Sequence, residues 1–532
     1  MKICSKIWGL VSLLSMQLVT PTLQDTTGDL RGPLPKIGTH EQASRICYVI
    51  LVKKYRDERE SPSDSLDGSI NLRNLREELL TAALPPKHYS VYDVASRYLG
   101  TWAIIVDRAP GREAYHKLKG IVQKYKKIIR AAQCDHGPQI HIFGPFISDD
   151  YDESTFFHPE TPPPTLRRRS DIQNFASKSR RNLTAEKLLE PRASSDEIYP
   201  GVLAQSWARP ELVMISQPEG VSLEEMEGTY YSYPNAGDGV LTYVIDSGCD
   251  FTLPEFAHID VPSVDWLFSG PLPSDERSDD DEPSNPQAYG HYLAGSDLTL
   301  GHHGTLVAGQ IVGNTMGVAS SASLVVVKLQ TGRNVAHTLI EIESLLKVYD
   351  HMYEERQKRG DSWLGFVVVY PHSDDRLRLY PESFANALIN LYVELVKAIS
   401  GHNGHIIVPA GNEDPDVPIP GSGFPTAMKA RAGVRSDPHF IVVGGIDTGT
   451  GLNAFQTADY VNFYGPGTNL RTVLPTEETV QGTSLVVPMV AGLLATLLGQ
   501  GVENPVEQME KWAYPRAAGG PDVIWNGITK AM

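Results

Sequence analysis

Short apolar runs alternate with longer stretches of helical spacing from about residue 198 to residue 532. Five of these runs are rich in β-branched residues and have the length of buried strands: 240–245, 324–329, 366–370, 406–409 and 441–444. Helical patterns lie between several of them, at residues 304–313, 339–353 and 384–400. Buried strands that alternate with helices predict an α/β fold with a mainly parallel sheet covered on both faces.

A separate pattern occupies residues 44–144. Strands are predicted at 46–52, 89–94, 101–106 and 139–143, with helices at 72–84 and 113–129. The order strand-helix-strand-strand-helix-strand is typical of a small α+β domain of the split βαβ type. The second helix carries several lysines, which we interpret as its solvated face; a basic surface that binds the acidic remainder of the chain is the alternative.

Residues 146–195 have little apolar periodicity and contain proline and charge runs, so we interpret them as a linker. The basic pair Arg180-Arg181 is a candidate processing site, and Asn182 begins a glycosylation sequon. At the start of the chain, two lysines precede an apolar core at 7–19, which predicts a signal peptide over residues 1–22. We therefore expect a secreted, extracellular precursor.

Length and charge narrow the function classes. A chain of 532 residues predicts two or three folded units. The net charge of −17 argues against nucleic-acid partners and against binding to an anionic membrane surface. We also expect the protein to be a monomer. Of the four cysteines, Cys4 leaves with the signal peptide. Cys47 and Cys134 flank one segment and could pair, and Cys249 would then be odd; no zinc-type spacing occurs among them.

Candidate chemistry centres on Ser484, where a Gly-Thr segment passes into a long apolar run that predicts a buried helix. A serine in the first turn of such a helix lies near unpaired backbone donors and the positive end of the helix dipole. This environment suits a nucleophile whose reaction develops negative charge. Taken alone, the same serine is more often an ordinary helix cap.

Three further residues complete an acyl-transfer site. His303 opens a helix of small residues and is the candidate base, Asp246 follows a buried strand and would orient the imidazole, and Asn412 follows another strand and could donate to an oxyanion. Each residue alone has an ordinary structural reading as a cap or turn residue. The four together, in the chain order Asp, His, Ser, match one of the orders in which this triad occurs.

The motifs around these residues resemble those of the subtilisin-like serine proteases, and among them most closely the secreted fungal, proteinase-K-like branch. They are Tyr243-Val244-Ile245-Asp246-Ser247-Gly248, His303-Gly304-Thr305 with Val307-Ala308-Gly309, Ala410-Gly411-Asn412, and Gly482-Thr483-Ser484 with Pro488. The resemblance covers residue 207 to the end of the chain. More loosely, residues 44–144 resemble the inhibitory propeptide of that family.

This resemblance implies a subtilisin-like three-layer fold over residues 198–532 and a serine endopeptidase that acts on proteins or peptides. Ser484 would be the nucleophile, His303 the base, Asp246 its orienting group and Asn412 the oxyanion donor. The chain's own propeptide would be a further partner. We expect no cofactor: the acidic loop within 271–301 could bind calcium but lacks a ligand register.

The chain departs from the family where substrate pairs with a strand. Members usually carry Ser-Leu-Gly-Gly there, whereas this chain carries Tyr370-Pro371, which adds bulk and removes a ladder donor. We expect Tyr370, Pro371 and Gly411 to line the substrate-binding edge. The altered edge leaves an alternative open: a non-hydrolytic protein of the same fold, a pseudoprotease, that binds peptides or partner proteins.

Overall fold

A computed structural model describes twelve stretches of the chain: residues 46–55, 66–83, 91–107, 112–134, 202–269, 303–329, 337–372, 382–415, 426–429, 434–455, 457–473 and 479–529. The predicted signal peptide, the linker with Arg180, Arg181 and Asn182, and the acidic loop lie outside these residues. None of the helices in the described stretches is long and apolar enough to cross a membrane.

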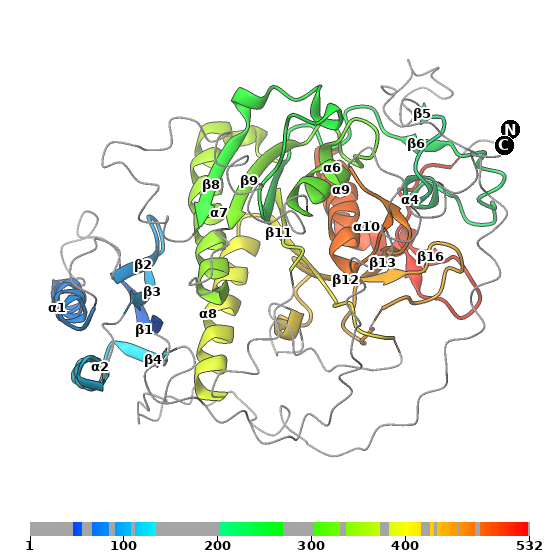
Figure 1. The fold of residues 1–532 in the computed structure, drawn as a ribbon. Helices are drawn as coiled ribbons and strands as arrows, with labels where there is room; N and C mark the ends of the chain where they lie inside the picture. The colour runs from blue at the N-terminus through cyan, green and yellow to red at the C-terminus, as the bar shows by residue number, and fades with distance from the viewer. Residues whose placement is uncertain are drawn as a thin grey trace, which may run out of the picture. The chain divides into compact units, whose positions relative to one another are not determined.

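The N-terminal part forms a four-stranded antiparallel sheet with two helices on one face (Figure 1). Its elements are β1 (Ile46–Tyr55), α1 (Leu66–Ala82), β2 (Val91–Ser96), β3 (Gly100–Asp107), α2 (Arg112–Lys124) and β4 (Ile129–Cys134), and the strand order is β2-β3-β1-β4. The predicted order of elements is therefore confirmed. Leu75, Leu79, Leu118 and Val122 pack from the helices onto Val49 and Ile104 of the sheet.

The predicted end of the second helix was wrong. α2 ends at Lys124 rather than at residue 129, and a strand that was not predicted, β4, begins at Ile129. Residues 139–143 lie outside the described stretches. β4 pairs antiparallel with β1, and the register sets Cys47 opposite Cys134. This register is compatible with the suggested disulfide between the two cysteines, and that disulfide stays a prediction. Cys249 is buried and free.

The C-terminal part is built on a nine-stranded sheet that is parallel except at one edge. The strands in spatial order are β16 (Tyr514–Pro515), β17 (Asp522–Val523), β13 (Phe463–Pro466), β12 (Phe440–Ile446), β11 (Gly404–Pro409), β10 (Phe366–Val369), β7 (Leu241–Asp246), β9 (Ser323–Leu329) and β8 (Asp265–Ser269). Only β16 and β17 pair antiparallel within it. The five predicted buried strands are β7, β9, β10, β11 and β12.

Helices cover both faces of this sheet, so the fold has three layers (Figure 1). The long helices α7 (His337–Arg359) and α8 (Glu382–Ser400) share one apolar core with Tyr243, Ile245 and Val368. The opposite core holds α6 (His303–Val312), α9 (Val486–Gly499) and the alternate strand residues Val244 and Val367. Successive strand side chains point to opposite faces, which is why both sides of each central strand are apolar.

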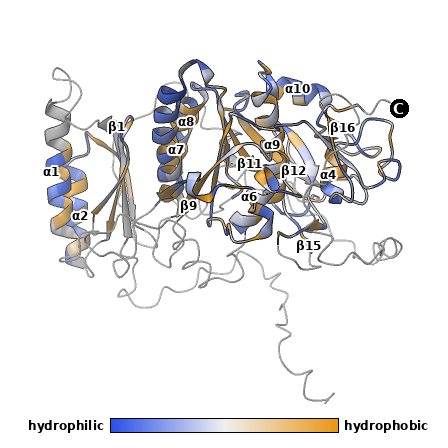
Figure 2. Cartoon of the chain, turned by 90° about the horizontal axis from the view of Figure 1, so that it is seen from above, coloured by the Kyte–Doolittle hydropathy of each residue, from blue (hydrophilic) through white to orange (hydrophobic). Residues whose placement is uncertain are grey.

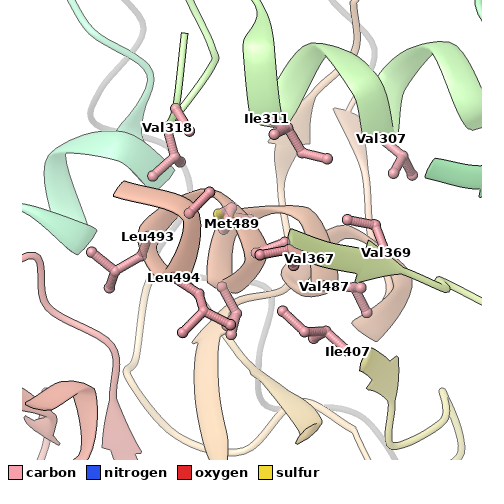
Figure 3. Packing of buried hydrophobic residues seen from close by; sticks show 14 of the residues in the cluster. Val307, Ile311, Val318, Val367, Val369, Ile407, Val487, Met489, Leu493 and Leu494 are labelled. Carbon is pink, nitrogen blue, oxygen red and sulfur yellow. The ribbon is translucent and has the colours of Figure 1, made fainter. Parts of the chain in front are cut away.

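The hydropathy pattern distinguishes the helices of the two layers (Figure 2). α7 and α8 show hydrophilic surfaces as well as apolar ones, whereas α9 is apolar along its length. A helix that is apolar all round belongs in a core. Figure 3 shows its residues Val487, Met489, Leu493 and Leu494 among Val307, Ile311, Val318, Val367, Val369 and Ile407.

The remaining elements lie outside the main sheet. Two small antiparallel pairs are β5 (Leu203–Gln205) with β6 (Tyr230–Ser232), and β14 (Leu470–Arg471) with β15 (Thr479–Val480). The short helices are α4 (Pro210–Ile215) and α10 (Pro505–Trp512), with 3-10 turns that include η8 (Thr483–Leu485). Because η8 leads directly into α9, the buried helix fixes the position of the residues that precede it.

Candidate active site

The candidate residues meet at one edge of the parallel sheet. Asp246 is the last residue of β7, and Asn412 follows β11 by three residues, while β10 lies between the two strands. The carboxyl ends of parallel strands share one edge, and in such sheets functional groups collect there. His303 starts α6 and Ser484 lies on η8, so all four candidates sit at the ends of elements.

A continuous line of hydrogen-bonding groups joins three of them. His303 Nδ1 lies 2.8 Å from Asp246 Oδ2, and His303 Nε2 lies 3.3 Å from Ser484 Oγ. The side chain of Asp246 is 1% exposed and that of His303 is 27% exposed. The carboxylate is therefore shielded from water, whereas the imidazole reaches the surface where a substrate would bind.

A close contact between two turns sets the first of these distances. A Cβ atom at Gly304 would lie 2.3 Å from the carbonyl oxygen of Gly248, so only glycine lets α6 start directly against the turn after β7. The amide of Gly304 also donates to Ser247 Oγ at 3.2 Å. Together these contacts bring His303 beside Asp246.

The surroundings of Asp246 keep its carboxyl group ionised. Burial by itself would raise the pKa of Asp246, but the charges of His303 and His372 act in the opposite direction. Hydrogen bonds from His303 and from the Ser247 amide, at 2.6 Å to Oδ1, also favour the carboxylate. The pKa of Asp246 consequently lies well below its ordinary value.

Asp246 in turn acts on the imidazole. The negative charge of Asp246 raises the pKa of His303 and outweighs the lowering that burial causes, and the hydrogen bond between them adds to the rise. The carboxylate thus stabilises the imidazolium form and holds Nδ1 as the donor. Nε2 of the neutral ring is then the acceptor that faces Ser484.

Asn412 is held by its side-chain oxygen. The amide of Thr483 donates to Asn412 Oδ1 at 2.7 Å, and Thr483 Oγ1 lies 2.9 Å from the same oxygen. With Oδ1 engaged in this way, the amide nitrogen Nδ2 is the end that can donate elsewhere. Thr483 also accepts from the Gly411 amide at 3.3 Å, which ties the two segments together.

Gly482 leaves the space between this donor and the serine. A Cβ atom there would lie 3.3 Å from Ser484 Oγ and 3.4 Å from Asn412 Nδ2. The residue has φ of 151°, a conformation that side chains with a Cβ rarely adopt. Ser484 itself precedes α9, whose first amides and dipole favour negative charge at this end.

The structure therefore brings together Asp246, His303, Ser484 and Asn412, as predicted from the sequence, and places Gly411 among them through Thr483. The structure differs from the expected substrate-binding edge at Tyr370 and Pro371. The Tyr370 side chain is 0% exposed and belongs to the core, and Pro371 is also buried. The Tyr370 amide donates to Ile407 O at 3.0 Å, so it continues the β10–β11 ladder. Neither side chain lines an open surface.

Two further charged or polar side chains at the site were not predicted. His372 follows β10 and places Nε2 3.6 Å from Asp246 Oδ2. Lys328 is the partner of Asp246 in the β7–β9 register, and its ammonium group donates to the Ser247 carbonyl. Burial lowers the pKa of Lys328 to about 8, although Asp246 opposes this shift. Because β9 and β10 pair with β7 on either side, residues at the ends of these two strands were candidates to lie beside Asp246.

An oriented imidazole next to a hydroxyl, with an amide donor nearby, can carry out acyl transfer. The hydroxyl would add to a carbonyl carbon, the imidazole would take its proton, and the donors would stabilise the oxyanion. In this site the imidazole, the hydroxyl and the amide donor come from His303, Ser484 and Asn412. These residues belong to different segments of the chain that meet at one edge of the sheet.

Comparisons with known proteins identify a family that this chain matches. The sequence profile described as "Subtilase family" matches residues 237–517, more than half of the chain. "Subtilisin-like protease 7" of Arthroderma gypseum is 25% identical over 280 residues, which cover 51% of this chain and 55% of the relative. "Cuticle-degrading serine protease" of Arthrobotrys oligospora is 26% identical over 302 residues, which cover 55% of this chain and 60% of the relative.

The chain therefore spans about half the length of the curated relatives that it matches. Among solved structures, a cold adapted subtilisin-like serine proteinase aligns with a TM-score of 0.41 and 18% identity. That alignment covers 61% of this chain and all of the other.

Proposed function

Because this chain belongs to the subtilase family, we propose that it is a serine endopeptidase that hydrolyses peptide bonds in proteins or peptides. The observation that carries the proposal is the line from Asp246 through His303 to Ser484, with spacings of 2.8 and 3.3 Å. Hydrolysis proceeds through an acyl-enzyme formed on Ser484, and it needs no cofactor.

In the first half of the reaction, Ser484 Oγ attacks the carbonyl carbon of the substrate and His303 Nε2 takes the hydroxyl proton. Asp246 holds the other ring nitrogen and stabilises the imidazolium that forms. The negative charge on the substrate oxygen is stabilised by Asn412 Nδ2 and by the Ser484 amide. His303 then gives its proton to the leaving amine, which departs and leaves the acyl group on Ser484.

In the second half, a water molecule replaces the amine. His303 removes a proton from the water as it attacks the acyl carbon, and the same oxyanion donors act again. Collapse of the tetrahedral species breaks the bond to Ser484 Oγ, which recovers its proton from His303. The enzyme returns to its starting state with the carboxylic acid product released.

Substitution of Asn412 tests its role as the oxyanion donor separately from its structural hydrogen bonds. In Asn412→Asp, the remaining side-chain oxygen can still accept from Thr483, but the Nδ2 donor is replaced by a second oxygen. We expect kcat to fall at least about 10²-fold with little change in KM, since in a subtilisin the loss of one such donor lowers kcat about 10²–10³-fold. Steady-state kinetics on a peptide substrate measures both constants; an unchanged kcat would exclude Asn412 as the donor.

The full chain is proposed to be a secreted precursor. The apolar segment in residues 1–22 would direct export, and the linker would be cut at Arg180-Arg181, next to a glycan on Asn182. The domain at residues 44–144 would be the chain's own propeptide. In support, Ser96 Oγ, the Arg97 amide and the Tyr98 amide all donate to the carboxylate of Asp350 on α7.

This contact predicts an effect on the association of the two parts after cleavage. Asp350→Ala removes the acceptor of these three donors, so we expect the N-terminal fragment to bind the catalytic part at least about tenfold more weakly. Glu355→Ala is a matched control, because Glu355 lies on the same helix and bonds Lys358 and Arg359 instead. The amount of N-terminal fragment that co-purifies with the catalytic part measures the effect. Equal co-purification of all three proteins would argue against this docking contact.

A second function rests on the edge after β10. The buried Pro371 gives no backbone donor there, and this favours the alternative of a peptide-binding pseudoprotease. The test is to incubate the secreted protein with a mixture of unstructured peptides and to search for new peptide termini by mass spectrometry. New termini support the endopeptidase, whereas binding of peptides without any new termini supports the pseudoprotease.

A further inference from the structure

A second imidazole approaches the buried carboxylate of the triad. His372 Nε2 lies 3.6 Å from Asp246 Oδ2, and the ring centres of His372 and His303 are 5.5 Å apart. His303 Nδ1 is 2.8 Å from the same carboxylate oxygen. Asp246 thus has one imidazole that hydrogen-bonds to it and a second that faces it beyond hydrogen-bonding distance.

His372 presents an unpartnered nitrogen to this carboxylate. Its Nε2 is buried and has no hydrogen-bond partner, yet it lies 3.6 Å from Asp246 Oδ2. Buried polar atoms almost always have a partner, so an unpartnered nitrogen that faces a carboxylate indicates a place where an ion can bind between them.

Such an arrangement is typical of a metal-binding site. Two imidazole nitrogens and a carboxylate oxygen are a common ligand set for Zn²⁺, and ligating histidines usually donate their other ring proton to a carbonyl or carboxylate. The ligand atoms of Asp246, His303 and His372 all lie within 4.8 Å of one another. Within the described residues, this is the group of His, Cys, Asp and Glu side chains that meets this spacing.

We propose that Asp246, His303 and His372 bind Zn²⁺ or a related late divalent transition-metal ion, and that the bound ion inhibits the enzyme. The ion would coordinate the Asp246 carboxylate oxygen and His303 Nδ1, which are hydrogen-bonded to each other in its absence. The Nδ1–H bond would break and the neutral ring would carry its proton on Nε2, the nitrogen that faces Ser484. His303 would then be unable to act as the oriented base for Ser484. The proposal that the ion binds depends on the ligand geometry alone. The proposal that the bound ion inhibits the enzyme also rests on the proposed function.

The neighbouring charges limit the affinity. Lys328 is buried beside Asp246 and carries a positive charge that opposes a divalent ion. Its ammonium group donates to the Ser247 carbonyl, so it does not occupy the space between His372 and the carboxylate. The His372 side chain is 32% exposed, so the site lies close to the surface although Nε2 itself is shielded. We therefore expect a reversible site that a chelator empties, rather than a permanent structural one.

Binding is tested on the full chain with Ser484→Ala, where hydrolysis plays no part. Calorimetric titration with Zn²⁺ should show one site whose affinity falls at least about tenfold in Ser484→Ala/His372→Asn. The added change His258→Asn is the matched control, because His258 is an exposed histidine, and it should leave the affinity unchanged. Absence of Zn²⁺ binding by the parent, or equal affinity in the His372→Asn protein, would overturn the proposal.

A second variant keeps the test decisive if His372→Asn does not fold, which circular dichroism in the presence of a chelator would reveal. Ser484→Ala/His303→Gln keeps His372 and removes another ligand of the set. Its affinity for Zn²⁺ should also fall at least about tenfold. Affinity equal to that of the parent would contradict the three-residue site.

The inhibition half is measured on the protein with Ser484 intact. Zn²⁺ should lower the rate of peptide hydrolysis and a chelator should restore it. The His372→Asn protein, compared with its own metal-free rate, should need at least about tenfold more Zn²⁺ for the same fractional loss. Hydrolysis that Zn²⁺ does not affect would reject the inhibition. Zn²⁺ binding in a protein that has no peptidase activity even with chelator would instead reject the proposed function and leave the metal site in place.

Discussion

Replacement of Ser484 by alanine will lower the turnover of peptide substrates by about 10⁶-fold, to the limit of detection. In a subtilisin, loss of the nucleophile alone costs about this much in kcat, because the other groups act only on the bond that the serine forms. Here Ser484 Oγ is the atom that His303 Nε2 faces at 3.3 Å. The purified variant is assayed on the same peptide as the parent, with Ser263→Ala as a control for an exposed serine.

The same variant tests how the proposed precursor would be cut. If the chain processes itself, Ser484→Ala will be secreted with the N-terminal domain still attached. If another protease cuts at Arg180-Arg181, the variant will be secreted at the size of the processed protein. Near-parental hydrolysis by a folded Ser484→Ala protein would overturn the assignment of the nucleophile.

The second large effect is expected for Asp246→Asn, which will lower kcat by about 10⁴-fold. The carboxylate accepts the Nδ1 proton of His303, whereas an amide can present its NH₂ group and hold the imidazole in the wrong tautomer. The side chain is 1% exposed, so water does not take over this role. The measurement is kcat for peptide hydrolysis, with Asp250→Asn as a control that makes the same chemical change four residues away.

The pH profile gives an independent readout of this substitution. His303 acts as a base only when it is neutral, so kcat/KM rises with pH through the pKa of His303. Asp246 raises that pKa, and an uncharged amide would not. The activity that remains in Asp246→Asn should therefore begin at lower pH than in the parent. An unshifted profile, or a loss of less than about tenfold, would contradict the role given to Asp246.

The central strands could be predicted from the sequence because each is apolar on both faces. Tyr243 and Ile245 enter one core and Val244 enters the other, so β7 reads as a continuous apolar run. The same holds for β10, where Val368 and Val367 face opposite helix layers. Long apolar runs of this kind depend little on distant contacts.

The last strand of the N-terminal sheet could not be predicted, because it depends on contacts between residues far apart in the sequence. Residues after Lys124 continue the helical spacing of α2, which made a helix to residue 129 the natural prediction. In the structure the chain turns and Ile129–Cys134 pairs with β1, a strand that lies far away in the sequence. Tertiary pairing overrides local propensity at this point, and sequence spacing gives no sign of it.

The triad and Asn412 could be predicted because each lies in a glycine-bounded motif, whereas His372 does not. A histidine after a strand is usually a surface residue, and the sequence interpretation treated the neighbouring Tyr370 and Pro371 as a substrate edge. The role of His372 depends on the parallel pairing of β10 with β7, which aligns Val369 with Val244. Only this adjacency of the two strands brings His372 to the end of β7, beside Asp246.

The most direct test of the account is to label the purified protein with a serine-reactive phosphonate and to map the label by mass spectrometry. The reagent reacts with a serine only where a base activates its hydroxyl. We expect a single label on Ser484 that is absent from His303→Ala. A folded protein that takes no label on Ser484, or equal labelling of His303→Ala, would contradict an assembled triad.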